Sequence, residues 1–246
     1  MYKRILLAGV ASAFVTSGAF AADIIEPSAF DWTGPYVGLQ GGYAWGDNDV
    51  EPQQLGTGDG IGAGANGRDV GVFPERDGSI DMDGFVGGLH AGYNWQLDSL
   101  VLGVEGDIEL ADIQGDTDIV GANDAAFGEA SQEIDWLGSL RLRGGFAFDR
   151  ALLYVTGGLA VGGVDARGSL PDALNSEFAS SDDTEWGWTL GGGIEYALTD
   201  DLSARIEYRY TDLGDTDVDF VDNGIMKKLE FENTFHAVRA GLSWHF

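Results

Sequence analysis

Apolar and polar residues alternate along eight separate stretches of this chain. Successive side chains of a β-strand point to opposite faces, so each stretch forms a ribbon with one oily face and one polar face. At residues 238–246 the pattern is clearest, and there Val238, Ala240, Leu242, Trp244 and Phe246 alternate with Arg239, Gly241, Ser243 and His245. The alternation predicts strands at roughly residues 34–45, 84–96, 100–111, 133–148, 151–164, 185–198, 202–211 and 238–246. Each stretch has about the 9–11 residues that a tilted transmembrane β-strand requires.

The oily faces of these strands carry many aromatic residues. In a transmembrane barrel the oily face meets lipid, the polar face meets the lumen, and aromatic residues mark the water interface. The fourth stretch places Ile134, Trp136 and Leu140 on its oily face, whereas the fifth is the least clear because both of its phases are apolar. The predicted girdle, together with the terminal residue, consists of Tyr43, Trp45, Tyr93, Trp95, Trp136, Trp186, Tyr208, Trp244 and Phe246.

The connections between the predicted strands alternate in length. Residues 97–99, 149–150 and 199–201 form short turns, and the long stretches, rich in Gly, Asp and Asn, are 46–83, 112–132, 165–184 and 212–232. Short turns on one side and long loops on the other are typical of an outer-membrane barrel. A β-sandwich offers no reason for such an alternation. The even strand number also predicts that both chain ends lie on the periplasmic side.

Charges of opposite sign fall on the polar faces of neighbouring strands. The predicted lumen network consists of Glu105, Asp107, Glu109, Arg141, Arg143, Glu195, Arg205, Glu207, Arg209 and Arg239. A buried charge without a partner is costly, so acidic and basic residues in the same phase indicate ion pairs across the lumen. A sandwich would have to bury this charged face or expose the rows of Trp, Leu and Phe.

The N-terminal sequence indicates in which cellular compartment the protein works. Lys3 and Arg4 precede an apolar run that ends in a small-x-small cleavage site at residues 19–21, as in a secretory signal peptide. The expected organisation is a cleaved signal peptide at 1–21, a short periplasmic segment at 22–33 and an outer-membrane barrel at 34–246. The apolar run is short for a spanning helix, which needs about 20 residues.

The amino-acid composition excludes several classes of partner and cofactor. There are no cysteines, so disulfides and thiolate metal sites are excluded. The formal net charge of −28 argues against nucleic acid or anionic lipid as a direct partner, because both require basic patches. No cofactor is expected beyond weak Ca²⁺ or Mg²⁺ at the acidic loops, where carboxylates would bridge to lipopolysaccharide phosphates. The expected partners are therefore outer-membrane lipid and lipopolysaccharide, and the oligomeric state stays open.

Several motifs along the chain resemble those of a known family. They are DWTGPYVG at 31–38, GGYAWG at 41–46, GGLHAGYNWQ at 87–96, VEGD at 104–107, YVTGGLA at 154–160, GGGIEY at 191–196 and EYRY at 207–210. In this order they are similar to the small RopB-type outer-membrane proteins of alphaproteobacteria, within the OmpA-like β-barrel group. The resemblance implies an all-β, eight-stranded antiparallel transmembrane barrel with short periplasmic turns and four long extracellular loops. It also implies that the barrel-assembly machinery reads Phe246. Pro35 departs from the pattern, but a proline is tolerated at the start of a strand.

The sequence favours a surface protein that supports envelope integrity, with its lumen plugged by side chains. The alternative is a narrow, cation-preferring porin, although an eight-stranded barrel has an interior that side chains just fill. An enzyme is not expected, because the outward-phase His236 has Val238, and no serine, as its next same-face neighbour. Haem ligation is disfavoured, because the four long loops contain no His, Tyr or Cys.

Overall fold

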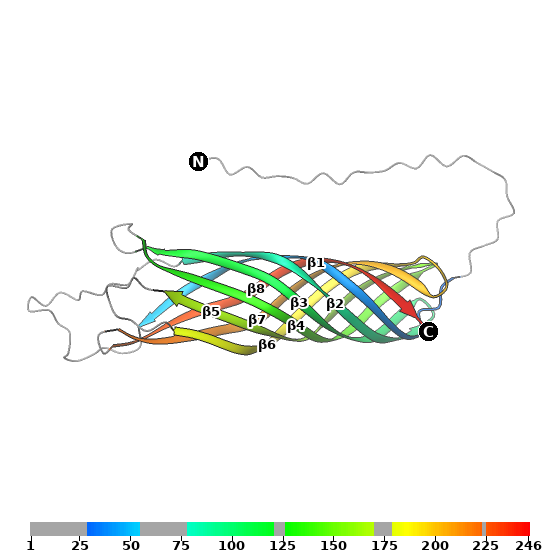
Figure 1. The fold of residues 1–246 in the computed structure, drawn as a ribbon. Helices are drawn as coiled ribbons and strands as arrows, with labels where there is room; N and C mark the ends of the chain where they lie inside the picture. Colours follow the sequence, from blue (N-terminus) through cyan, green and yellow to red (C-terminus); the bar gives the residue numbers. More distant parts are fainter. Residues whose placement is uncertain (1–28, 55–77, 121–125, 170–178, 223–224) are drawn as a thin grey trace, which may run out of the picture.

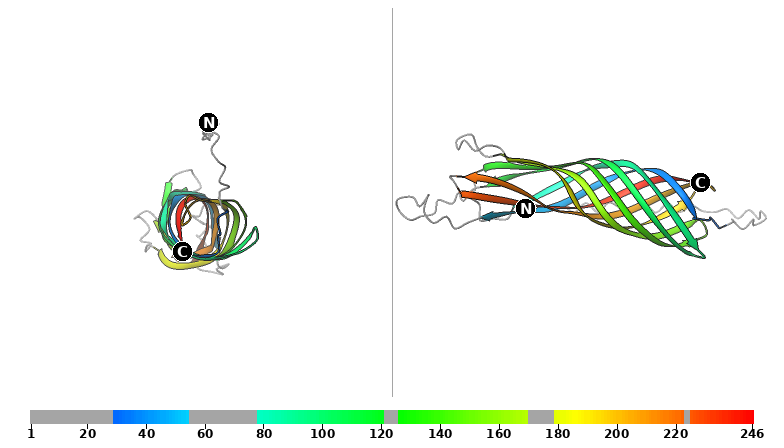
Figure 2. Two further views of the ribbon diagram at one scale, coloured as in Figure 1. Left: turned by 90° about the vertical axis from the view of Figure 1, so that its right-hand side faces the viewer. Right: turned by 90° about the horizontal axis from the view of Figure 1, so that it is seen from below.

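The chain forms one closed barrel of eight antiparallel strands (Figures 1 and 2). The computed structural model describes residues 29–54, 78–120, 126–169, 179–222 and 225–246, so the predicted signal peptide and most of the segment 22–33 lie outside the described residues. The strands are β1 (Gly34–Gln54), β2 (Gly78–Leu97), β3 (Leu100–Val120), β4 (Ala126–Phe148), β5 (Ala151–Ser169), β6 (Ala179–Ala197), β7 (Leu202–Asp222) and β8 (Ile225–His245). Each strand pairs with the next, and β1 closes the ring on β8. The predicted fold class is confirmed.

The three short connections lie at one end of the barrel, together with the C-terminus (Figure 1). We refer to this end as the turn end and to the opposite one as the far end. Two of the turns contain an aspartate in the left-handed region, Asp98 at φ 55° and Asp149 at φ 51°. Aspartate is among the residues that adopt this conformation most readily. A helix long and apolar enough to cross a membrane does not occur in the described part of the chain.

The strands continue well past their predicted ends toward the far end. β1 and β2 remain paired as far as Val50 and Gly78, and β3 continues to Val120. The predicted loops 46–83, 112–132, 165–184 and 212–232 were therefore too long, because much of each one is strand. Above the lipid-facing band the alternation continues with its polarity reversed. Asp81 faces outward there, while Ile80 and Met82 are buried inside.

One predicted orientation is wrong. Ile134 is 1% exposed and lies inside the barrel, not on the oily face. The pairing of β4 with β5 shifts between Ile134 and Trp136, which leaves Asp135 as an extra residue. Such a bulge changes the phase of a strand, so Trp136 faces outward over Gly163 while Ile134 turns inward. The structure also settles the phase of β5, whose Leu153 is exposed and whose Tyr154 is buried.

The barrel interior has three layers. At the turn end, one apolar cluster contains Phe30, Trp32, Val101, Leu152, Tyr154 and Ala197. Toward the far end, a second one contains Ala44, Ile80, Met82, Val86, Ile113, Ile134, Leu137, Ala160, Val164, Leu213, Phe235 and Ala237. On β3 the acidic residues of positions 105–109 separate Val101 of the first cluster from Ile113 of the second. We call them the lower and the upper apolar cluster, with a charged layer between them.

Candidate functional site

The charged layer brings together all ten residues of the predicted lumen network. Because side chains of one phase share a face, β3, β4, β6, β7 and β8 each direct their polar phase into the lumen. The strand registers set opposite charges beside each other, with Glu105 opposite Arg141 and Glu195 opposite Arg205. None of the ten side chains is more than 3% exposed.

Arg141 lies at the centre of this layer. Its guanidinium donates to the carboxylates of Glu105, of Asp107 at 2.9 Å and of Glu207 at 3.0 Å. Arg205 donates to the other oxygen of Glu105 at 2.5 Å. Each carboxylate around Arg141 therefore also pairs with a second arginine. This second partner is Arg205 for Glu105, and Arg209 for both Asp107 and Glu207.

Arg209 and Arg239 carry the network toward the far end. Arg209 pairs with Glu207 at 2.7 Å and with Asp107 at 3.2 Å. Arg239 binds Glu109 through two nitrogens, at 2.9 Å from Nε to Oε1 and 2.9 Å from Nη2 to Oε2. This two-point geometry is the stronger form of an arginine–carboxylate pair.

Arg143 and Glu195 form a second, more isolated pair nearer the turn end. Arg143 donates to Glu195, and its guanidinium carbon lies 3.7 Å from the centre of the Tyr154 ring. Glu195 also accepts from the Ser203 hydroxyl at 2.5 Å. His245 is 3.5 Å from the same carboxylate. The cation thus has a carboxylate on one side and an aromatic face on the other, an arrangement that stabilises a desolvated charge.

Two aromatic residues before β1 close the turn end, and sequence reasoning missed them. Trp32 is fully buried and Phe30 is 7% exposed. The backbone N–H of Phe30 donates to the carbonyl of Asp149 at 3.0 Å, and that of Trp32 donates to Gln96 Oε1 at 2.8 Å. Both rings meet the His245 ring edge to face. The only signal in the sequence was that two aromatic residues stand two positions apart just ahead of the first strand.

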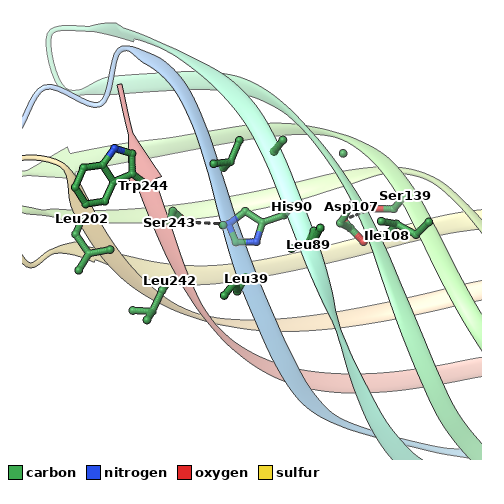
Figure 3. Close-up of a pocket in the computed structure, with 14 residues that line it drawn as sticks. Leu39, Leu89, His90, Asp107, Ile108, Ser139, Leu202, Leu242, Ser243 and Trp244 are labelled. Carbon is green, nitrogen blue, oxygen red and sulfur yellow. Dashed lines mark hydrogen bonds between the residues drawn. The ribbon is translucent and has the colours of Figure 1, made fainter.

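Each of the three histidines lies within hydrogen-bond distance of a hydroxyl group. His90 and His245 point into the lumen, where their Nε2 atoms lie 2.9 Å from the hydroxyls of Ser243 and Ser203. His236 faces outward, its Nδ1 is 2.7 Å from the Tyr208 hydroxyl, and its ring stacks on Trp45. Figure 3 shows the His90–Ser243 pair beside a groove of about 850 Å³ that is lined mainly by outward apolar side chains. In the described residues no group of three or more His, Asp or Glu side chains is placed to hold a metal ion.

The predicted girdle residues lie on the outer wall at both edges of the apolar band. Most are exposed, from 37% for Tyr93 to 74% for Phe246, whereas Trp136 is only half-exposed beside Gly163. Aspartates follow directly above the band on the outer wall, at positions 47, 81, 83, 112 and 135. An apolar band between aromatic rows is what a lipid bilayer requires of a barrel wall.

Comparison with known proteins agrees with this geometry. Residues 6–246 match the family described as outer membrane protein beta-barrel domain. The chain belongs to this family. It is 39% identical to the 31 kDa outer-membrane immunogenic protein of Brucella melitensis, over 99% of this chain and all of the relative. It is 32% identical to a 22 kDa outer membrane protein of Rhizobium leguminosarum, over 66% of this chain and 67% of that protein. The predicted resemblance to small alphaproteobacterial barrels is confirmed.

The fold also matches a solved member of this architecture. The outer membrane protein OprG from Pseudomonas aeruginosa superposes with a TM-score of 0.50 at 14% identity, covering 89% of this chain and 98% of OprG. The family match and the two relatives named as outer-membrane proteins locate the protein in the outer membrane, as predicted. Its apolar band spans the bilayer, the turn end faces the periplasm, and the far end is extracellular.

Proposed function

We propose that this protein is a structural surface barrel whose lumen is plugged by its own side chains. The observation that carries the proposal is the sequence of layers inside the barrel, with paired charges between two apolar clusters. A water-filled path would have to cross both clusters. It would also have to part ion pairs whose members are almost completely buried.

A contribution to envelope integrity and surface display is the second part of the proposal. The strands extend beyond the apolar band, and above the outer leaflet their outer face carries acidic side chains. The Brucella relative is named as immunogenic, which supports exposure of such a wall to the outside. We infer that the band binds outer-membrane lipid and lipopolysaccharide, that Ca²⁺ or Mg²⁺ binds weakly to the carboxylates above it, and that the assembly machinery reads Phe246.

Single-channel recording tests the plugged lumen. Purified protein in planar bilayers should give no stable conductance. The matched variant F30A/W32A, which empties the periplasmic mouth but keeps the charged layer, should stay silent as well. A large, stable pore in the wild-type protein would contradict the proposal and would make a cation-preferring porin the better description.

A deletion strain tests the envelope role. Loss of the protein should increase sensitivity to detergent and to a chelator, and the wild-type gene should restore resistance. Complementation with D47N/D81N/D83N, which removes outer-wall carboxylates, should restore detergent resistance but only part of the chelator resistance. Equal sensitivity of deletion and wild-type strains would refute the envelope role, whatever the recordings show.

A further inference from the structure

An open groove lies in the lipid-facing wall of the barrel. It has a volume of about 850 Å³ and extends from the start of β7 across β8, β1 and β2 to β3 (Figure 3). One end lies at Leu202 and Trp244, beside the turn end, and the other lies at Ile108, further along β3. Because the turn end faces the periplasm, the groove begins in the periplasmic leaflet. The large side chains along it are Val37, Leu39, Leu89, Ile108, Leu242 and Trp244, which are 47–63% exposed.

The floor of the groove is formed by Ala91 on β2 and Gly106 on β3. These two residues lie opposite each other in the strand register, and both belong to the outward phase. On one side Ala91 pairs with Val37, and on the other side Gly106 pairs with Leu140. Two small residues therefore stand between large apolar ones, which leaves a depression in the wall.

The packing of the barrel does not require a glycine at position 106. An added β-carbon would lie 3.5 Å from the Ser139 carbonyl oxygen and 4.0 Å from Leu140 Cδ1, which is ordinary van der Waals contact. At Gly88, on the inner face, the same atom would lie only 2.0 Å from the Ile108 carbonyl oxygen. Glycine weakens a strand interior, and it often marks a place where a ligand approaches the backbone closely. The space over Gly106 therefore indicates an occupant from outside the chain.

The turns beside the groove are acidic. Asp201 lies in the turn before β7, Asp98 lies in the turn before β3, and both are exposed, as is Asp31 ahead of β1. Arg150, from the turn between β4 and β5, pairs with Asp200 at 3.3 Å. One arginine among four aspartates leaves this rim anionic. An anionic headgroup would be repelled there, whereas a headgroup with an ammonium group would be attracted.

We propose that the groove binds one acyl chain of a phospholipid from the periplasmic leaflet, and that the headgroup of this lipid carries an amine. The chain lies over Ala91 and Gly106 with strand side chains on both sides, whereas lipid elsewhere contacts a convex wall on one side only. Since lipid surrounds the whole band, the preference arises from additional van der Waals contacts and not from removal of apolar surface from water. The inference rests on the lipid contact proposed above and adds the place, the leaflet and the headgroup.

Photo-crosslinking of the intact protein in lipid vesicles tests the proposal. The probe is a phosphatidylethanolamine with a photoreactive diazirine in the middle of one acyl chain, and mass spectrometry maps the labelled residues. Phosphatidylglycerol with the same chain is the comparison, because its headgroup has no amine. G106L and A91L each fill the floor of the groove from a different strand. G144L is the matched control, since Gly144 lies outside the groove and an added β-carbon would have its nearest neighbour, Leu102 Cδ2, at 3.8 Å.

The expected result is an excess of label in the groove. Residues 37–39, 89–91 and 106–108 should be labelled about tenfold more than the outward residues of 153–159 on β5, a difference that needs only roughly ten additional carbon–carbon contacts. G106L and A91L should abolish this excess, whereas G144L should keep it. The phosphatidylglycerol probe should give a smaller excess than the phosphatidylethanolamine probe.

Four other results would contradict parts of this reasoning. Equal labelling of the whole band, or the same loss in G144L as in G106L, would overturn the groove while leaving the general lipid contact intact. Equal labelling by the two probes would overturn the headgroup assignment. Labelling that falls as the protein-to-lipid ratio rises would overturn the proposal, because a second copy of the chain would then cover the groove. Absence of label from the entire band would instead refute the lipid contact proposed for the wall.

Discussion

Removing one partner of the buried Arg143–Glu195 pair should destabilise the barrel strongly. In R143M the carboxylate of Glu195 stays 0% exposed and loses its basic partner. It keeps the Ser203 hydroxyl at 2.5 Å and His245 at 3.5 Å, neither of which replaces a guanidinium. Breaking a buried ion pair on one side costs about 3–5 kcal/mol. The lost contact with the Tyr154 ring adds up to roughly 2 kcal/mol.

Two further variants distinguish the effect of breaking a buried ion pair from the effect of removing a charge. E195Q should cost about as much as R143M, since it leaves a buried guanidinium without its carboxylate. The double variant R143M/E195Q should cost less than either single one, because it leaves no unpaired charge. D200N serves as the control, since Asp200 is 89% exposed and pairs with Arg150 at 3.3 Å. Such surface pairs contribute about 0–1 kcal/mol.

Urea unfolding in lipid vesicles, followed by tryptophan fluorescence, measures these free energies of unfolding. The cycle of four proteins yields the coupling between Arg143 and Glu195. If R143M costs no more than D200N, or if the double variant costs the sum of the two single ones, the charged layer does not stabilise the barrel in the way argued above.

Three other substitutions test other parts of the wall and lumen by the same unfolding measurement. W32A should cost about 3–5 kcal/mol, because it empties the fully buried periplasmic mouth, and W32F should recover most of that loss. G88A should cost about 1–3 kcal/mol, because its β-carbon would collide with the backbone of Ile108 and Glu109, whereas G41A should be neutral since the nearest atom is 3.6 Å away. L140R places a charge in the lipid-facing band and should cost about 2–4 kcal/mol, against at most about 1 kcal/mol for D112R above the band. A loss of stability in G41A or D112R equal to that of its counterpart would contradict the assignment of inward, outward and lipid-facing positions.

The faces of the strands could be predicted from the sequence because they depend only on a period of two. Glu105 and Arg141 share the inward phase of neighbouring strands, and the observed register sets them opposite each other. The partner of Arg143 could not be predicted in this way, since Glu195 belongs to β6, two strands further around the ring. Contacts across the lumen depend on the barrel radius and on the shear of the strands, which alternation does not encode.

The alternating pattern could not predict two local features of the barrel, a bulge in β4 and an aromatic pair ahead of β1. The bulge at Asp135 reverses the phase of β4 without any glycine or proline to mark it. The aromatic pair Phe30 and Trp32 precedes the first alternating stretch, so its burial depends on a mouth that only the closed barrel creates.

The largest difference from the prediction is that the upper parts of the strands were assigned to loops. This difference has one physical cause. A lipid-facing strand is apolar outside and polar inside, and a search for that pattern stops where Trp45 gives way to Asp47 and Phe85 to Asp83. The solvent outside the wall changes there from lipid to water, so the favourable arrangement inverts to acidic outside and apolar inside. The upper part is therefore built like a water-soluble barrel around its own core, which includes Ile80 and Ile113. That core lies above the bilayer band, so the upper wall packs around apolar side chains of its own even where the strand pairing ends early, as it does for β2 and β3 above Asp83 and Gln114 and for β6 and β7 above Trp188 and Asp212.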